Sequence, residues 1–122
     1  MTPMTFEDLQ SWQEARRIVR MIYELTRTGP LSRDFGLCGQ IQTAAVSIMS
    51  NIAEGFERIH LPEKTQAYNI ARGSAAEVRS LLYVIEDNYH EMGKHSAMMR
   101  REIVVVGKLI SGLLRSTARR NA

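Results

Sequence analysis

The sequence predicts an all-α protein, an antiparallel up-down-up-down four-helix bundle, on three observations. Apolar residues recur at three- and four-residue spacing in four blocks. No stretch shows the alternation of apolar and polar residues that is typical of strands. Glycine or proline stands near each boundary, which leaves short connections. Because short connections make consecutive helices antiparallel neighbours, we expect the helices to alternate in direction.

The first two helices are expected at residues 6–28 and 36–58. The first follows Thr5, a residue type that favours helix starts, and it ends before Gly29 and Pro30. The second has an apolar face whose members are Leu37, Ile41, Ala44, Ala45, Ile48 and Ile52. These two segments therefore each present one face to a common core.

The last two helices are expected at residues 62–90 and 96–118. Pro62 suits the first turn of a helix, because its fixed φ fits and its missing N–H is not needed there. Glu63 favours the positive end of the helix dipole. Gly93 is expected to break the chain between the two helices, and the basic C-terminal end is expected to fray.

Composition favours one domain over residues 1–122 in a reducing cytoplasm. A hydrophobic content of 44% can form one core without disulfides. The one cysteine, Cys38, is expected to be a small core residue, and the N-terminus lacks the features of a signal peptide. The longest apolar run is far shorter than the roughly 20 residues that cross a bilayer. We expect no membrane span.

Positive charge is concentrated in the last helix. Residues 93–122 contain seven lysines and arginines and one acid, Glu102, although the net charge of the chain is only +3. Such a surface can attract phosphates, although a solvated helix face would give the same pattern. The candidate nucleic-acid-binding residues are Arg100, Arg101, Lys108, Arg115, Arg119 and Arg120.

Small residues in the two middle helices predict a close helix crossing. The segments "TAAVS" (43–47) and "ARGSAA" (71–76) have short side chains, which let two helix backbones approach. Gly55 and Gly73 each cost a helix roughly 1 kcal/mol relative to alanine, so we expect a packing gain at both positions.

A polar stripe runs beside the apolar face in "SIMSNIAEGFER" (47–58). The polar residues of this stripe and those of the third helix could meet near the crossing and form a structural network. The candidate members are Asn51, Glu54, Arg72, Ser74 and Glu77. Glu54 and Glu77 could instead form a carboxylate pair for acid-base chemistry or metal binding, and partner binding is a third reading. Di-metal bundles use Glu-x-x-His, which this chain lacks. We therefore favour the structural network and expect no enzyme activity, metal or cofactor.

The segments "AAVSIMSNIAEGFER" and "AYNIARGSAAEVRSLL" resemble the signature of the four-helix bundle family that includes proteins encoded in 23S rRNA intervening sequences. The resemblance spans almost the whole chain, and the family is similar to the accessory protein of diversity-generating retroelements, a basic bundle that associates with a reverse transcriptase and nucleic acid. The resemblance implies that this chain forms a homopentamer around a central channel. The positions that match the family pattern are Asn51, Glu54, Gly55, Arg58, Gly73, Ser74 and Glu77.

The sequence departs from the family pattern just after Gly55. The family usually has a second glycine and an arginine there, whereas this chain has Phe56, Glu57 and Arg58. The negative charge of Glu57 disfavours phosphate contact at this turn, so the basic fourth helix is the better candidate. We expect a non-enzymatic homo-oligomeric module that contacts RNA or DNA. The alternative is a scaffold that binds only protein, in which the basic residues are solubilising or pair with neighbouring subunits.

Overall fold

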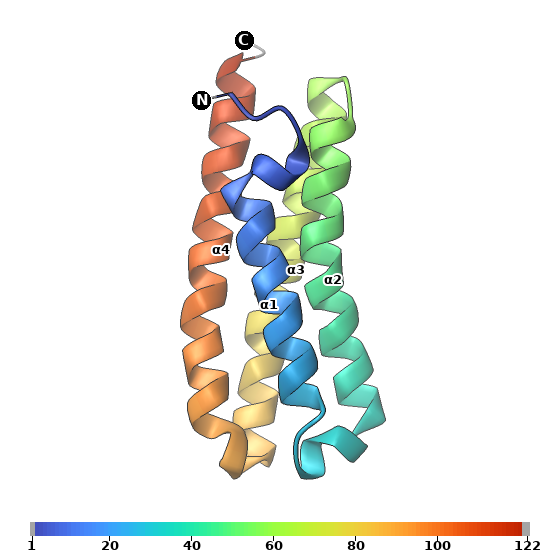
Figure 1. Cartoon of the computed structure of the whole chain (residues 1–122), viewed down its shortest axis with the longest axis vertical. Helices are drawn as coiled ribbons and strands as arrows, with labels where there is room; N and C mark the ends of the chain where they lie inside the picture. Colours follow the sequence, from blue (N-terminus) through green and yellow to red (C-terminus); the bar gives the residue numbers. More distant parts are fainter. Residues whose placement is uncertain (1, 121–122) are drawn as a thin grey trace.

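The computed structural model describes residues 2–120 and contains four α-helices that lie side by side (Figure 1). The helices are α1 (Gln10–Thr26), α2 (Phe35–Glu57), α3 (Leu61–Asn88) and α4 (Gly93–Arg120). Followed by colour, consecutive helices run in opposite directions, and the start of α1 and the end of α4 lie at the same end of the bundle (Figure 1). The predicted four-helix bundle is confirmed.

The packing order follows the chain order around the bundle. Helix α1 packs against α2 and α4, and α3 packs against the same two helices. The core between them consists mainly of branched aliphatic side chains, which fill space in few rotamers. Its largest fully buried members are Ile18, Ile22, Leu31, Ile41, Ile48, Ile52, Tyr68, Val78, Leu82, Ile85, Ile103 and Ile110. Cys38 belongs to the same core, as predicted.

Helix α1 begins later than the sequence pattern suggests, at Gln10 and not at residue 6. Phe6–Asp8 form a separate 3-10 turn, and Leu9 has an extended backbone with φ −73° and ψ 126°. The buried side chain of Leu9 joins the core, and the Asp8 carboxylate accepts hydrogen bonds from the N–H groups of Met4 and Thr5. These local contacts compete with the first α-helical turn.

The turn between α3 and α4 also differs from the expectation, because Gly93 is the first residue of α4. The chain reverses direction at Tyr89, whose φ is −136° and ψ is 79°, and a 3-10 turn (His90–Met92) follows. The Tyr89 hydroxyl donates to the Asp34 carboxylate at 2.7 Å. Asp34 also accepts from the N–H of Leu37 as the cap of α2. One carboxylate thus holds two chain reversals at the same end of the bundle.

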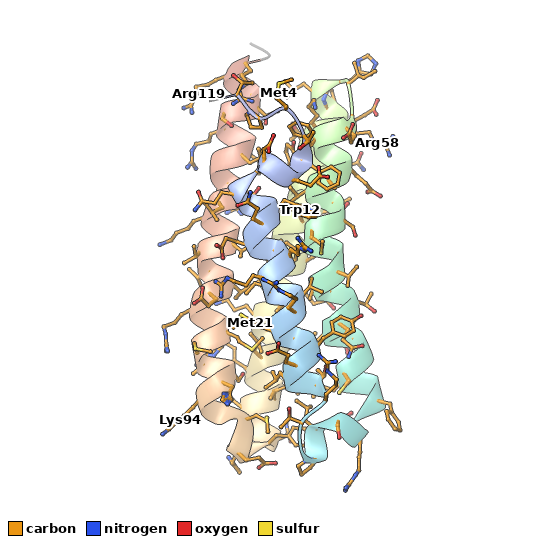
Figure 2. The ribbon with its side chains drawn as sticks, viewed as in Figure 1. Met4, Trp12, Met21, Arg58, Lys94 and Arg119 are labelled. Atoms are coloured by element: carbon orange, nitrogen blue, oxygen red, sulfur yellow. The ribbon has the colours of Figure 1, made fainter. Side chains whose placement is uncertain are left out.

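Helix α4 continues to Arg120, two residues beyond the predicted end. Its two ends are marked by Lys94 and Arg119, whose side chains project outward from the bundle (Figure 2). Within residues 2–120, no helix combines the length and the apolar character that crossing a bilayer requires.

Candidate nucleic-acid interface

The predicted close crossing of α2 and α3 is present at two points. The first is a hydroxyl pair, in which Ser47 and Ser74 lie 2.8 Å apart and share a hydrogen bond. Asn51 donates its side-chain amide to the Ser47 hydroxyl at 3.1 Å and to the Ser47 carbonyl at 2.9 Å. Two of the predicted network residues, Asn51 and Ser74, are therefore linked through Ser47.

The second point is Gly55, which faces the ring of Tyr68. A Cβ added at Gly55 would lie 2.5 Å from a ring carbon of Tyr68, closer than real Cβ atoms approach any neighbour. Tyr68 is fully buried, so the glycine makes room for a ring that cannot move into solvent. Lys64 then donates to the carbonyl groups of Gly55 and Phe56, at 3.3 and 2.8 Å, which satisfies the end of α2.

The remaining members of the predicted network lie on the surface. Glu54, Arg72 and Glu77 are exposed, and within residues 2–120 none of the three forms a hydrogen bond or an ion pair. Arg58 projects outward from the bundle (Figure 2). Its guanidinium forms a long ion pair, at 3.9 Å, with the carboxylate of Glu63. Nothing lies within 4 Å of a Cβ built on Gly73, so the packing gain expected there is absent from the single chain.

Glu54 and Glu77 line two different hollows of the surface. Glu54 lines a shallow hollow with Glu57 and Arg58, whereas Glu77 lines a separate one with Ser47 and Ser74. Among residues 2–120, no group of three or more His, Cys, Asp or Glu side chains is placed to hold a metal ion. The two carboxylates therefore do not share a hollow.

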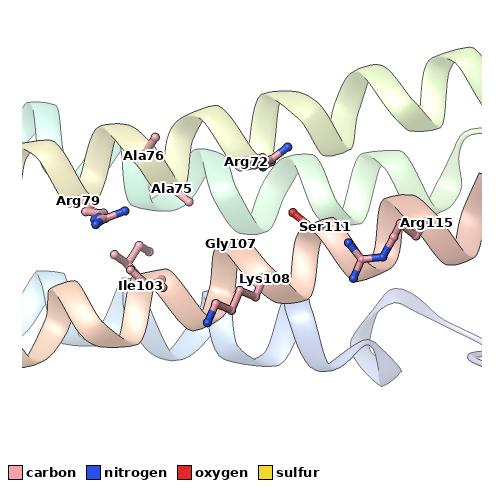
Figure 3. Close-up of a pocket in the computed structure, with 10 residues that line it drawn as sticks. Arg72, Ala75, Ala76, Arg79, Ile103, Gly107, Lys108, Ser111 and Arg115 are labelled. Atoms are coloured by element: carbon pink, nitrogen blue, oxygen red, sulfur yellow. The ribbon is translucent and has the colours of Figure 1, made fainter.

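Four cations that have no hydrogen-bond or ion-pair partner within residues 2–120 line a groove between α3 and α4. Arg72 and Arg79 come from α3, and Lys108 and Arg115 come from α4 (Figure 3). The groove has a volume of about 610 Å³, and none of its lining residues is acidic. Between the cations lie small residues that keep the groove open, and these are Ala75, Ala76, Gly107 and Ser111.

The spacing of these cations is regular on both helices. Arg72 and Arg79 are seven residues apart, as are Lys108 and Arg115, so each pair lies on one helix face about 10.5 Å apart along the axis. Arg101 stands a further seven residues before Lys108 and is exposed. The groove therefore presents two rows of guanidinium and ammonium groups along facing helices.

The one acid of α4 is held on another side of the helix. Glu102 accepts a hydrogen bond from Arg17 of α1 at 2.6 Å, and this ion pair raises the pKa of Arg17 further above its ordinary value. Because Glu102 pairs across the α1–α4 contact, it does not neutralise the groove between α3 and α4. The local field of the groove is therefore more positive than the net charge of the chain suggests.

Arg100 has a different environment from the other predicted phosphate contacts. Its guanidinium donates to both carboxylate oxygens of Glu86, at 2.5 and 2.9 Å, and lies over the ring of Tyr83. These hydrogen bonds lower the pKa of Glu86 and raise that of Arg100. Such a bidentate pair holds both charges in place and leaves Arg100 less free to bind a phosphate.

The six sequence candidates thus separate into three sets. Lys108 and Arg115 line the groove, Arg100 is paired with Glu86, and the remaining three are exposed outside the groove lining, namely Arg101, Arg119 and Arg120. The sequence analysis does not predict the α3 side of the groove. It places Arg72 in the polar network and does not include Arg79, although the seven-residue spacing of these two arginines matches that of Lys108 and Arg115.

Comparison with known proteins agrees with the fold and the motif. The model of the 23S rRNA-intervening sequence protein family matches residues 7–112, which include α1, α2 and α3 and the larger part of α4. The chain belongs to this family. The comparison with curated proteins finds no match.

A solved structure shows the same fold. It is the crystal structure of a protein of unknown function from the S23 ribosomal protein family of Bacteroides thetaiotaomicron. The two are 17% identical and align with a TM-score of 0.77 over 86% of this chain and 95% of that one. At this identity the likeness concerns the arrangement of the helices and not the groove residues.

Proposed function

We propose that this protein is a non-enzymatic binding module that holds nucleic acid in the basic groove between α3 and α4. The observation that carries the proposal is the set of four cations, Arg72, Arg79, Lys108 and Arg115, in a groove without a lining acid. Clustered cations release counterions when they neutralise phosphates, and this release favours binding of a polyanion. RNA is the first ligand to test, because the family takes its name from 23S rRNA intervening sequences.

The groove is more suitable for a phosphate chain than for a small anion. Its cations lie in two rows with steps of about 10.5 Å, so no single compact ligand would meet all four of them. An extended backbone, in contrast, can place successive phosphates along both rows. Exposed Arg101, Arg119 and Arg120 on the same helix would add long-range attraction beyond the groove itself.

We also propose that the protein assembles as a homo-oligomer, with the pentamer that the family resemblance implies as the expected state. The outer face of α3 supports this proposal, because it combines the open Gly73 with exposed Ile70 and Val84, which are 47% and 40% exposed. A second copy could cover this face with its own helix. The buried free thiol of Cys38 suits the reducing cytoplasm as the compartment.

A protein-only scaffold is the second candidate function. The pairing of Arg100 with Glu86 favours it in part, since it shows one basic residue of α4 serving the fold and not a ligand. In this alternative, the groove cations would pair with acids of another protein or another subunit. The scaffold would bind its partner equally well after nuclease treatment.

The test compares RNA binding by two charge-matched double variants. Arg79→Gln with Arg115→Gln removes one groove cation from each helix. Arg20→Gln with Arg33→Gln removes two exposed cations of other elements, neither of which has a partner among residues 2–120. At low salt we expect several-fold weaker binding of an RNA pool by the groove variant and wild-type binding by the control. Equal binding by both variants would contradict the proposal.

A further inference from the structure

An exposed aromatic ring lies where the basic groove continues past Arg79. Tyr83 is 45% exposed and follows Arg79 by four residues and Ala76 by seven, so it lies on the same face of α3 as these two groove residues. On the opposite helix, Arg100 precedes the groove residue Val104 by four residues. Tyr83 and Arg100 therefore face each other one turn beyond the groove lining.

The ring of Tyr83 is held in position from one side. The guanidinium carbon of Arg100 lies 4.2 Å from the centre of the ring, and Arg100 donates to the Tyr83 hydroxyl at 3.1 Å. Arg100 is itself fixed by its two hydrogen bonds to Glu86, and Ser96 adds a hydrogen bond to the same carboxylate at 3.3 Å. A ring that is exposed but already ordered loses little entropy when another flat group stacks on it.

Binding sites for single-stranded nucleic acid combine the same two features, a basic groove and an exposed aromatic ring. A basic groove follows the phosphate chain, and an aromatic ring beside it receives a base. In a duplex the bases are stacked within the helix and cannot reach such a ring, whereas in a single strand or a loop they can. Arg100 covers one face of the ring with an ordered planar group, and its charge is already balanced by Glu86.

We propose that Tyr83 is a stacking platform for an unpaired base and that the groove therefore takes single-stranded RNA. This inference rests on the proposed function, because it requires a phosphate chain in the groove between α3 and α4. It adds the class of nucleic acid and a residue that recognises it. Tyr83 and the groove cations then have separable roles, since stacking does not depend on counterion release and the phosphate contacts do.

The experiment measures binding of fluorescein-labelled oligoadenylate by anisotropy, alone and annealed to oligouridylate. Tyr83→Leu removes the ring and keeps an apolar side chain, whereas Tyr83→Phe keeps the ring and is the matched control. We expect Tyr83→Leu to weaken single-strand binding about 5- to 150-fold, and Tyr83→Phe to stay close to wild type. Binding of the duplex and the salt dependence should not differ between wild type and Tyr83→Leu.

A second readout detects the stacking directly. An oligoadenylate that contains 2-aminopurine should show a different fluorescence in complex with wild type or Tyr83→Phe than in complex with Tyr83→Leu, at saturating protein. Identical fluorescence in all three complexes would overturn the stacking role.

Two results would overturn this inference while leaving the proposed function intact. The first is that Tyr83→Leu binds the single strand with the affinity of wild type. The second is that wild type binds the duplex more tightly than the single strand. The proposed function survives either result if Arg79→Gln/Arg115→Gln still binds more weakly than wild type. If wild type binds neither oligonucleotide at low salt, the proposed function itself fails and this inference fails with it.

Discussion

At the residue scale, two glycines of the family motif have opposite surroundings. Gly55 contacts the buried ring of Tyr68, whereas a Cβ at Gly73 would meet nothing within 4 Å. In the sequence both look alike, because each is a glycine within an amphipathic helix near a run of small residues. Helical spacing indicates which face a residue lies on, but not which large side chain of another helix reaches it.

This difference predicts opposite effects of the same substitution. Gly55→Ala should destabilise the fold by up to about 2 kcal/mol, because an overpacking cost of about 1–3 kcal/mol against Tyr68 outweighs the roughly 1 kcal/mol gained in helix propensity. Gly73→Ala should stabilise the single chain by about 0.5–1 kcal/mol. Urea unfolding followed by circular dichroism measures both. Equal effects of the two substitutions would contradict the close contact at Gly55.

At the element scale, α3 and α4 are joined by the pair of Glu86 and Arg100. Arg100 hydrogen bonds lower the pKa of Glu86 in the folded protein below its ordinary value of about 4.5. The stabilisation is therefore fully present above about pH 4.5 and is lost as the pH falls through the lowered pKa. The pair also lies in contact with Tyr83, so the same link holds the proposed stacking ring.

The substitution Glu86→Gln should remove this pH dependence. We expect the variant to be less stable than wild type at pH 7 and the difference to shrink as the pH falls below about 4.5, because the wild-type carboxylate then becomes protonated. Glu77→Gln on the same helix is the matched control, since Glu77 has no partner within residues 2–120. Thermal unfolding between pH 3 and pH 7 is the measurement. A constant difference between wild type and Glu86→Gln over this range would contradict the role of the pair.

The four helices could be predicted from the sequence more accurately than the residues at which they begin and end. Apolar spacing placed all four helices because each must bury one face, and this requirement leaves a clear period. The start of α1 at Gln10 and the first residue of α4 at Gly93 depend on contacts that carry no period, namely the Asp8 carboxylate with nearby N–H groups and the Tyr89 hydroxyl with Asp34. Such ends follow from side chains that meet only after folding.

At the scale of the whole molecule, the candidate site arises from the pairing of α3 and α4. The sequence indicated basic residues on α4, but half of the groove cations, Arg72 and Arg79, belong to α3. These two arginines line the groove only because their face of α3 is turned toward α4. The polar stripe in the sequence predicts instead that Arg72 faces the second helix. The sequence therefore predicts that the last helix carries a positively charged surface. It does not predict the groove, because the groove depends on how α3 and α4 pack against each other.

The proposed assembly leads to a prediction about the outer face of α3. Gly73→Gln should leave the fold intact, because a side chain there meets open space in the single chain, but it should reduce the oligomer by occupying the subunit contact. Gly107→Gln, at an equally open glycine that lines the groove, should leave the mass unchanged. Light scattering after size exclusion measures this mass. A wild-type mass equal to one chain would contradict the oligomer, and an unchanged mass of Gly73→Gln would contradict this contact.

The most direct test of the central claim is the salt dependence of RNA affinity for wild type and the two charge-matched double variants. For wild type, the logarithm of the association constant should fall linearly with the logarithm of salt concentration. The slope should be shallower by about 1.4 for Arg79→Gln/Arg115→Gln on single-stranded RNA, and unchanged for Arg20→Gln/Arg33→Gln. Three equal slopes, or no binding by wild type at low salt, would contradict the assignment of the α3–α4 groove as the nucleic-acid site.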